Sequence, residues 1–239
     1  MPAADNKLKQ DVKDRIISET ADGSKTLYMP SIDEHYHSVK GALTESMHIF
    51  IDCGLRHSAA QSPHILEIGF GTGLNAYLTL LEAEKEKRNI SYTAIERYPL
   101  EHTTADKLGY CLLPEMDNKK LFDALHLSAW EEQVKMTEHF TLLKRQADFT
   151  DTDSWKDIKK YDIVYFDAFS PEKQPEMWSA QIFSQLYQNM NHNGILTTYC
   201  AKGCIRRMMQ DAGFAVERLP GPPGGKREIL RATKTTMTK

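Results

Sequence analysis

Residues 64–75, HILEIGFGTGLN, indicate the fold class of this chain. Residues 64–68 form a short apolar run typical of a buried strand, and the three glycines that follow at alternate positions let the backbone turn sharply into a helix. Glycine here also lets a ligand lie against the main chain, where a side chain would clash. The stretch therefore predicts a strand, a glycine turn that can cradle a ligand, and a helix.

Strands and helices alternate along the rest of the chain. Further strands are expected at residues 91–97, 140–148, 161–169 and 194–200, helices at 39–57, 178–190 and 202–212, and a polar helical stretch at about 100–137. Residues 214–219 and 226–233 form the expected closing pair around the turn PGPPGG. This order predicts an α/β, Rossmann-like fold with a doubly wound, mostly parallel seven-stranded sheet and an antiparallel closing strand.

The composition fits one domain, expected at residues 31–233, with a polar N-terminal arm over 1–30 and a tail over 234–239. A length of 239 residues is too short for two well-sized catalytic domains. We expect a cytoplasmic protein without a membrane segment or metal, because no apolar run could span a bilayer, no secretory signal is evident and the four cysteines form no C-x-x-C pair. The net charge of −3 means that nucleic-acid binding would need a local basic patch.

The glycine turn favours S-adenosylmethionine over a dinucleotide as ligand. Its spacing is G-x-G-x-G rather than G-x-G-x-x-G, and Glu67 stands two residues before the first glycine. A carboxylate there can meet the ammonium or sulfonium of S-adenosylmethionine, whereas NAD brings a pyrophosphate. A purely structural turn remains an alternative at this point.

Two further acids end neighbouring predicted strands. Glu96, at the tip of the second strand, can accept both ribose hydroxyls of an adenosine, although NAD enzymes use the same device. Asp148, followed by Phe149 at the end of the third strand, can bond the adenine amino group while the ring packs on the base. Because open α/β sheets bind ligands at the carboxyl edge, we expect these groups to lie together.

The loop after the fourth strand, DAFSPEKQPEMW at residues 167–178, carries the expected chemistry. An acid beside an aromatic ring and a proline-stiffened loop resembles the acidic-Pro-Pro-aromatic signature of amino methyltransferases. Asp167 could accept a hydrogen bond from an amine and orient its lone pair, and Phe169 could wall the transfer site. Met177 and Trp178 are expected to pack as core.

Six blocks of the sequence together resemble the methyltransferase domain of the bifunctional tRNA-modifying MnmC family, over most of residues 36–231. The blocks are YHS-x-x-GALTES (36–46), EIGFGTGLN (67–75), ERYPL (96–100), DAFSPEKQPEMW (167–178), YCAKGCIRRMMQDAGF (199–214) and GGKREIL (224–230). The resemblance implies a class I S-adenosylmethionine-dependent methyltransferase with Asp167 as the catalytic residue. The cofactor-binding residues that we predict are Glu67, Gly69, Phe70, Gly71, Thr72, Gly73, Asn75, Glu96, Arg97, Asp148, Phe149, Asp167 and Ala168.

The reaction that the resemblance implies is methylation of 5-aminomethyl-(2-thio)uridine at the tRNA wobble position. The family's flavin-dependent oxidase segment has no counterpart in this sequence, so we expect a separate enzyme to supply the aminomethyl-uridine. Gln174 stands where the family has asparagine, and Cys204 where it has an aromatic residue. Both departures lie on the acceptor side and leave the donor motifs intact.

Basic residues near the predicted site are the candidates for contact with the anticodon region of tRNA. The predicted substrate-binding residues are Phe169, Ser170, Lys202, Arg206, Arg207, Lys226 and Arg227. The histidines lack metal-ligand spacing and are expected to be structural or to line the rim of the site; they are His35, His37, His48 and His57. Two alternatives stay open: a methyltransferase of a small amine or protein, and a dinucleotide-dependent oxidoreductase.

Overall fold

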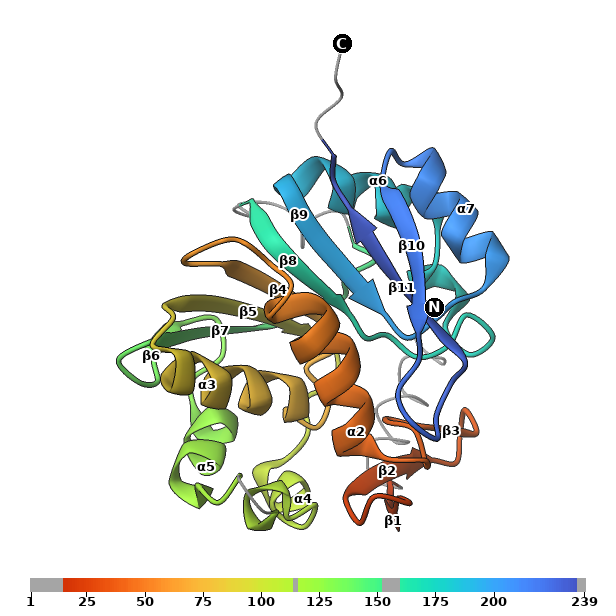
Figure 1. Cartoon of the computed structure of the whole chain (residues 1–239). Coiled ribbons are helices and arrows are strands. Elements are labelled where there is room, and N and C mark those ends of the chain that lie inside the picture. Colours follow the sequence, from red (N-terminus) through yellow and green to blue (C-terminus); the bar gives the residue numbers. More distant parts are fainter. Residues whose placement is uncertain (1–14, 114–115, 152–159, 236–239) are drawn as a thin grey trace.

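A central eight-stranded sheet organises the chain (Figure 1). The computed structural model describes residues 15–113, 116–151 and 160–235. The strand order is β10-β11-β9-β8-β4-β5-β7-β6. The strands are β4 (His64–Ile68), β5 (Ile90–Glu96), β6 (Gln133–Lys135), β7 (Phe140–Gln146), β8 (Tyr161–Phe166), β9 (Met190–Thr198), β10 (Ala215–Pro220) and β11 (Glu228–Thr233).

The predicted fold class is confirmed. Strands β7, β5, β4, β8 and β9 pair in parallel, and β11 enters antiparallel between β9 and β10. The closing pair is joined by the predicted proline- and glycine-rich turn. The eighth strand, β6, was not expected, because it is a three-residue segment that pairs antiparallel with the outer edge of β7.

The expectation of one polar helical stretch over residues 100–137 is wrong beyond residue 127, and the helical part before it is divided into separate elements. The segment contains α4 (His102–Asp106), the short 3-10 turn η2 (Tyr110–Leu112), α5 (Lys119–Leu127) and then β6. The Lys144 ammonium, on β7, caps the C-terminal end of α5. It donates hydrogen bonds to the carbonyls of Leu125 and His126, both at 2.8 Å. The chain beyond is free to add to the open edge of β7, a tertiary effect that local helix propensity does not show.

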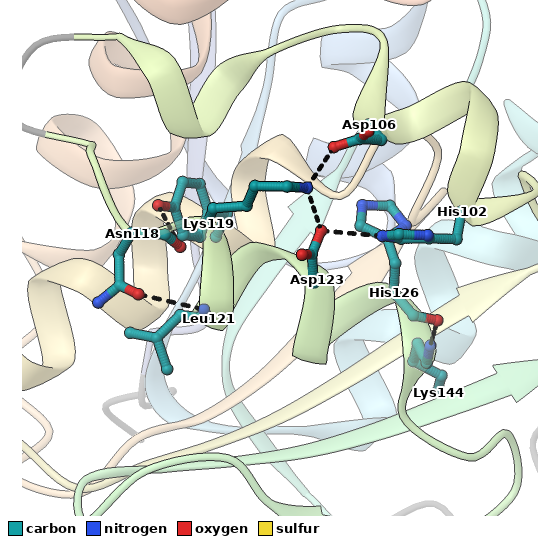
Figure 2. Close-up of polar contacts among 9 residues, drawn as sticks. His102, Asp106, Asn118, Lys119, Leu121, Asp123, His126 and Lys144 are labelled. Carbon is teal, nitrogen blue, oxygen red and sulfur yellow. Dashed lines mark hydrogen bonds and ion pairs between the residues drawn. The ribbon is translucent and has the colours of Figure 1, made fainter.

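The ends of α5 are fixed by polar contacts that Figure 2 shows. The Asn118 side chain accepts from the Leu121 N–H at 3.2 Å and so caps the first turn. The Lys119 ammonium bridges Asp106 of α4 and Asp123 of α5. At the other end, burial lowers the pKa of Lys144 to about 8. These contacts hold α5 against the sheet behind the glycine turn.

Two hydrophobic layers cover the sheet, one on each face. Side chains alternate along each strand, so Ile65 and Tyr165 enter one layer while Leu66 and Phe166 enter the other. The first layer packs against the π-helical η1 (Met47–Leu55), which continues α2 (Ala42–Ser46), and against α3 (Leu74–Glu86) and α5. The second packs against α6 (Ala180–Asn189) and α7 (Gly203–Asp211). The helices predicted from periodicity are thus present on both faces.

Part of the polar arm expected over residues 1–30 is a folded antiparallel sheet. Its strands are β1 (Ile16–Glu19), β2 (Lys25–Met29) and β3 (Glu34–His35). Leu27 is fully buried. The Asp22 carboxylate accepts from the N–H of Ser24 at 3.0 Å and of Thr44 at 2.9 Å, so it joins this sheet to α2. Residues 1–14 of the expected arm, and 236–239 of the expected tail, lie outside the described residues.

The small N-terminal sheet lies beside the carboxyl ends of the central strands (Figure 1). The glycine turn between β4 and α3 opens at the same edge. Within the described ranges, the structure has no helix that is both long and apolar enough to cross a membrane.

Candidate active site

A cavity of about 350 Å³ opens at the carboxyl edge of the sheet, in the size range of small-molecule sites. Most of the predicted site residues line it together: Gly69, Phe70, Gly71, Thr72, Asn75, Glu96, Arg97, Asp148, Phe149, Asp167, Ala168, Phe169 and Lys226. The predicted residues outside the lining are Glu67, Gly73, Ser170, Lys202, Arg206, Arg207 and Arg227. Strand order therefore brings together motifs that are up to about 160 residues apart in sequence.

The glycine turn has a backbone that other residues could not adopt without strain. Gly69 has φ 90°, and a Cβ there would lie 2.8 Å from the carbonyl oxygen of Asp167. Gly71 has φ 50°, and its Cβ would lie 3.2 Å from the Tyr36 ring. At Gly73 a Cβ would lie 2.8 Å from Nε2 of the His126 ring. The turn is thus closely packed on three sides, and its remaining side forms the floor of the cavity.

The acids predicted for the nucleoside are held in place by local contacts. The Glu96 carboxylate accepts from the N–H of Gly71 at 2.9 Å and of Tyr98 at 2.8 Å. Asp148 forms an ion pair with Arg97 at 2.8 Å. Phe149 is 3% exposed and packs into the hydrophobic layer below. These side chains line one end of the cavity with fixed orientations, as a ribose and base site requires.

Glu67 lies behind the glycine turn rather than at the cavity surface. It is fully buried because β4 is central in the sheet and both faces are covered. Burial, followed by the nearby charge of Asp167, raises the pKa of Glu67 well above its ordinary value. The structure therefore does not bring this carboxylate to where a donor cation would contact it directly.

Asp167 begins the loop after β8 and faces the cavity. Its N–H donates to the Ile68 carbonyl at 3.1 Å, and the Asn75 amide, in the first turn of α3, donates to its carboxylate at 2.8 Å. Burial raises the pKa of Asp167 to about 7, the charge of Glu45 adds to the rise, and Asn75 and Lys226 oppose it. A carboxylate with such a pKa can exchange a proton near neutral pH.

The cavity has a roof that single motifs did not predict. The Tyr36 ring, next to β3, packs edge-on against Phe169 with centroids 5.1 Å apart. His37 bonds the Thr72 hydroxyl at 2.7 Å and is buried, which lowers its pKa to about 4 and keeps it neutral. Glu45 of α2 also lines the cavity. In the sequence, these residues were marked only by the block at 36–46. That block did not predict which residues they contact, because those contacts depend on the fold.

The loop after Asp167 is anchored at both ends. Phe169 lines the cavity, while the Ser170 N–H and hydroxyl donate to Glu34 at 3.0 and 2.9 Å. The indole N–H of Trp178 donates to the Phe169 carbonyl at 2.7 Å, and Trp178 is buried, as expected of a core residue. Met177 is also buried, yet it reaches the cavity lining.

The predicted basic patch is divided between the cavity and its surroundings. Lys226, on the turn between β10 and β11, lines the cavity. Lys202 lies at the start of α7, where it pairs with Glu172, and Arg206 and Arg207 lie within α7. No group of three His, Cys, Asp or Glu side chains that could hold a metal ion occurs in the described parts of the chain.

These features fit S-adenosylmethionine. The glycine turn forms a cradle that side chains would fill, and the fixed acids Glu96 and Asp148 stand at one end. At the other end, Glu45 Oε1 is buried and lacks a hydrogen-bond donor among the described residues. An adenosine at the first end and a cationic group at the second match the chemistry of the lining.

Comparison with known proteins decides the family. A family model described as S-adenosyl-L-methionine-dependent methyltransferase matches residues 115–235, half of the chain. The chain belongs to this family. The enzyme's cofactor is therefore S-adenosyl-L-methionine, which excludes the dinucleotide-dependent oxidoreductase.

Curated relatives of the methyltransferase are named tRNA 5-methylaminomethyl-2-thiouridine biosynthesis bifunctional protein MnmC. The protein from Leptospira borgpetersenii is 30% identical over 212 residues, which are 83% of this chain and 32% of the relative. The protein from Cupriavidus metallidurans is 31% identical over 224 residues, 87% of this chain and 32% of the relative. The chain thus spans about a third of the length of these relatives, and the resemblance inferred from the six blocks is confirmed.

Solved structures support the fold. The methyltransferase is similar to MNMC2 from Aquifex aeolicus with a TM-score of 0.72 and 24% identity, over 92% of this chain and 70% of that one. Spermidine synthase from Thermotoga maritima matches with a TM-score of 0.53 and 11% identity, over 92% and 72%.

Replacing Gly71 with Asp is expected to abolish cofactor binding. The residue has φ 50° and packs under the Tyr36 ring, so a carboxylate would displace the turn or fill the cavity floor. Calorimetric titration with S-adenosylhomocysteine measures the loss, and a thermal melt shows whether the variant is folded. Normal binding by the folded variant would contradict this placement of the turn.

Replacing Asp167 with Asn is expected to stabilise the fold above neutral pH. The pKa of Asp167 is raised from 3.8 to about 7, so its contribution to stability is present below about pH 4 and is lost as pH rises through 7. Asn keeps an acceptor for Asn75 without the buried charge. The variant should melt above the wild type at pH 8, by about 2–4 °C for each kcal/mol recovered, and the difference should shrink at pH 5. A pH-independent difference in Tm would contradict the assignment.

Proposed function

We propose that this chain methylates the primary amine of 5-aminomethyl-(2-thio)uridine at the tRNA wobble position, giving 5-methylaminomethyl-(2-thio)uridine. The observation that supports it most is Asp167, a half-buried acid with a pKa of about 7 that shares one cavity with the donor motifs. The relatives' names describe biosynthesis of this nucleoside, and the chain aligns with about a third of their length. The proposed activity is the methylation alone, without the steps that form the aminomethyl-uridine.

Asp167 prepares the amine. An aliphatic amine has a pKa of about 10 and is mostly protonated at pH 7, so its lone pair must be freed before it can react. A carboxylate with a pKa near 7 can take that proton and then accept a hydrogen bond that aligns the lone pair. Bound S-adenosylmethionine supplies an electrophilic methyl group on its sulfonium. Asn75 holds the Asp167 carboxylate in position at 2.8 Å.

Aromatic side chains enclose the acceptor end of the cavity. Phe169 and Tyr36 form an edge-on pair, and the Tyr199 hydroxyl donates to the Ala168 carbonyl at 2.8 Å. Rings next to a cationic amine or sulfonium contribute about 0.5–2 kcal/mol each and exclude water from the reacting atoms. Ala168 and Phe169 are thus proposed to shape the space around the transferred methyl group.

The tRNA is proposed to bind over the carboxyl edge. Residues that contact the phosphates or sugars of a bound anticodon loop are expected to lie around the cavity rather than in its lining. Five of the predicted substrate-binding residues lie there: Ser170, Lys202, Arg206, Arg207 and Arg227. In this scheme the protein acts in the cytoplasm, and a separate enzyme supplies the aminomethyl-uridine.

The proposed activity is tested with purified protein, S-adenosylmethionine and tRNA that carries 5-aminomethyl-2-thiouridine. Nucleoside mass spectrometry should show one methyl group added to the wobble nucleoside. Unmodified tRNA and free amines such as spermidine serve as alternative substrates. Methylation of the free amines but not of the tRNA would refute the proposal and leave a small-amine methyltransferase.

Replacing Asp167 with Asn should reduce methyl transfer to this tRNA by about 10²–10⁴-fold near pH 7, because both proton transfer and orientation are lost. The loss should become smaller as pH rises and free amine becomes abundant. Single-turnover rates between pH 6 and 9 measure this, with tRNA affinity expected to change little. Wild-type turnover near pH 7 would remove Asp167 from the mechanism.

A further inference from the structure

Glu45 and Lys226 form an ion pair inside the cofactor cavity, and neither residue has a part in the proposed methyl transfer. The Lys226 ammonium lies 3.5 Å from Glu45 Oε1 and 3.6 Å from the centroid of the Tyr199 ring. Glu45 comes from α2 and Lys226 from the turn between β10 and β11, so the two charges meet across the cavity from distant segments. Both residues line it.

One oxygen of the Glu45 carboxylate accepts a hydrogen bond, whereas the other accepts none from the described residues. Its Oε2 accepts from the Ser38 N–H at 2.8 Å. Its Oε1 is buried and receives no hydrogen bond from the described residues, and the whole side chain is only 8% exposed. A buried carboxylate oxygen is costly without a donor, so this atom is a strong acceptor for a cationic ligand group.

The other acids of the cavity are already engaged. Glu34 accepts two hydrogen bonds from Ser170, Glu96 accepts two from backbone N–H groups, and Asp148 pairs with Arg97. Glu67, predicted from its position before the glycine turn to meet a cation of the donor, is buried behind the turn. Among the described acids that line the cavity, Glu45 is thus the one whose carboxylate has a buried oxygen without a hydrogen bond.

Lys226 is the cation best placed to act with it. The donor carries an ammonium and a carboxylate on the same carbon atom, so the groups that bind them must be adjacent. Arg15 also lines the cavity, but its guanidinium lies over Tyr36 and donates to the Tyr98 carbonyl at 3.1 Å, near Glu96. Only Lys226 lies within 4 Å of Glu45 among the cavity's described cations.

We propose that Glu45 and Lys226 are the subsite for the amino-acid end of the cofactor: Glu45 accepts from the ammonium, and Lys226 binds the carboxylate. The ion pair between them is exchanged for two ion pairs with the zwitterion. Lys226 therefore serves the donor rather than a tRNA phosphate. This inference depends on the family's cofactor and not on the proposed tRNA substrate.

Ligands that differ only at the amino-acid end test the proposal. S-adenosylhomocysteine has both charges, whereas 5′-methylthioadenosine keeps the nucleoside and the sulfur but has neither. Glu45→Gln and Lys226→Met should each weaken S-adenosylhomocysteine binding by about 10- to 100-fold, as expected for loss of a charge-assisted contact. Binding of 5′-methylthioadenosine should stay within about 2-fold of the wild type, because no charged contact is lost.

Matched controls come from the same hairpin. Arg218 and Glu228 form an ion pair at 3.3 Å outside the cavity, so Arg218→Met and Glu228→Gln remove the same kinds of charge without touching the subsite. Both should bind the two ligands as the wild type does. Calorimetry of the full chain gives the affinities, and melting curves confirm that each variant is folded.

Two results would overturn the proposal. Equal weakening of both ligands would show that Glu45 and Lys226 act only through the structure of the cavity. Unchanged affinity for S-adenosylhomocysteine, with tRNA binding weakened in Lys226→Met, would assign the lysine to the RNA. Because neither ligand titration contains tRNA, failure here is distinct from failure of the proposed substrate.

Discussion

The close approach of the glycine turn to the end of β8 is the constraint on which the site depends. The Asp167 N–H donates to the Ile68 carbonyl, and the carbonyl oxygen of Asp167 lies only 2.8 Å from the position that a Cβ of Gly69 would take. This close contact holds the start of the loop after β8 against the glycine turn. It is possible because β4 and β8 are adjacent and parallel, so both chains leave the sheet at the same edge.

Three acidic side chains lie close to the contact between the glycine turn and the end of β8. Glu67 is buried behind the turn, Asp167 faces the cavity, and Glu45 approaches from α2. Burial, and after it the repulsion from a neighbouring carboxylate, raises the pKa of Glu67 and of Asp167. As a result, the carboxyl group of Asp167 has a pKa of about 7.

The N-terminal segment has a larger part than its polar composition suggests. Tyr36 covers Gly71, His37 bonds Thr72, and Glu34 anchors the loop after Asp167 through Ser170. The roof of the cavity thus comes from a sheet that precedes the Rossmann-like core. It covers the cavity on the side that the parallel strands leave open, and the Tyr36–Phe169 pair joins it to the loop after Asp167.

Three features could be predicted from the residues alone: the strand–turn–helix unit at residues 64–86, the order of the strands along the chain, and the placement of Glu96, Asp148 and Asp167 at one edge of the sheet. These follow from local periodicity and glycine stereochemistry, which act within a few residues. The tertiary structure alone decided that Gln133–Lys135 adds a strand, that Glu67 is turned away from the cavity and that Glu45 meets Lys226. The reason is that such pairings form between segments up to 181 residues apart, and their energies depend on burial and neighbouring charge, which appear only when the chain is packed.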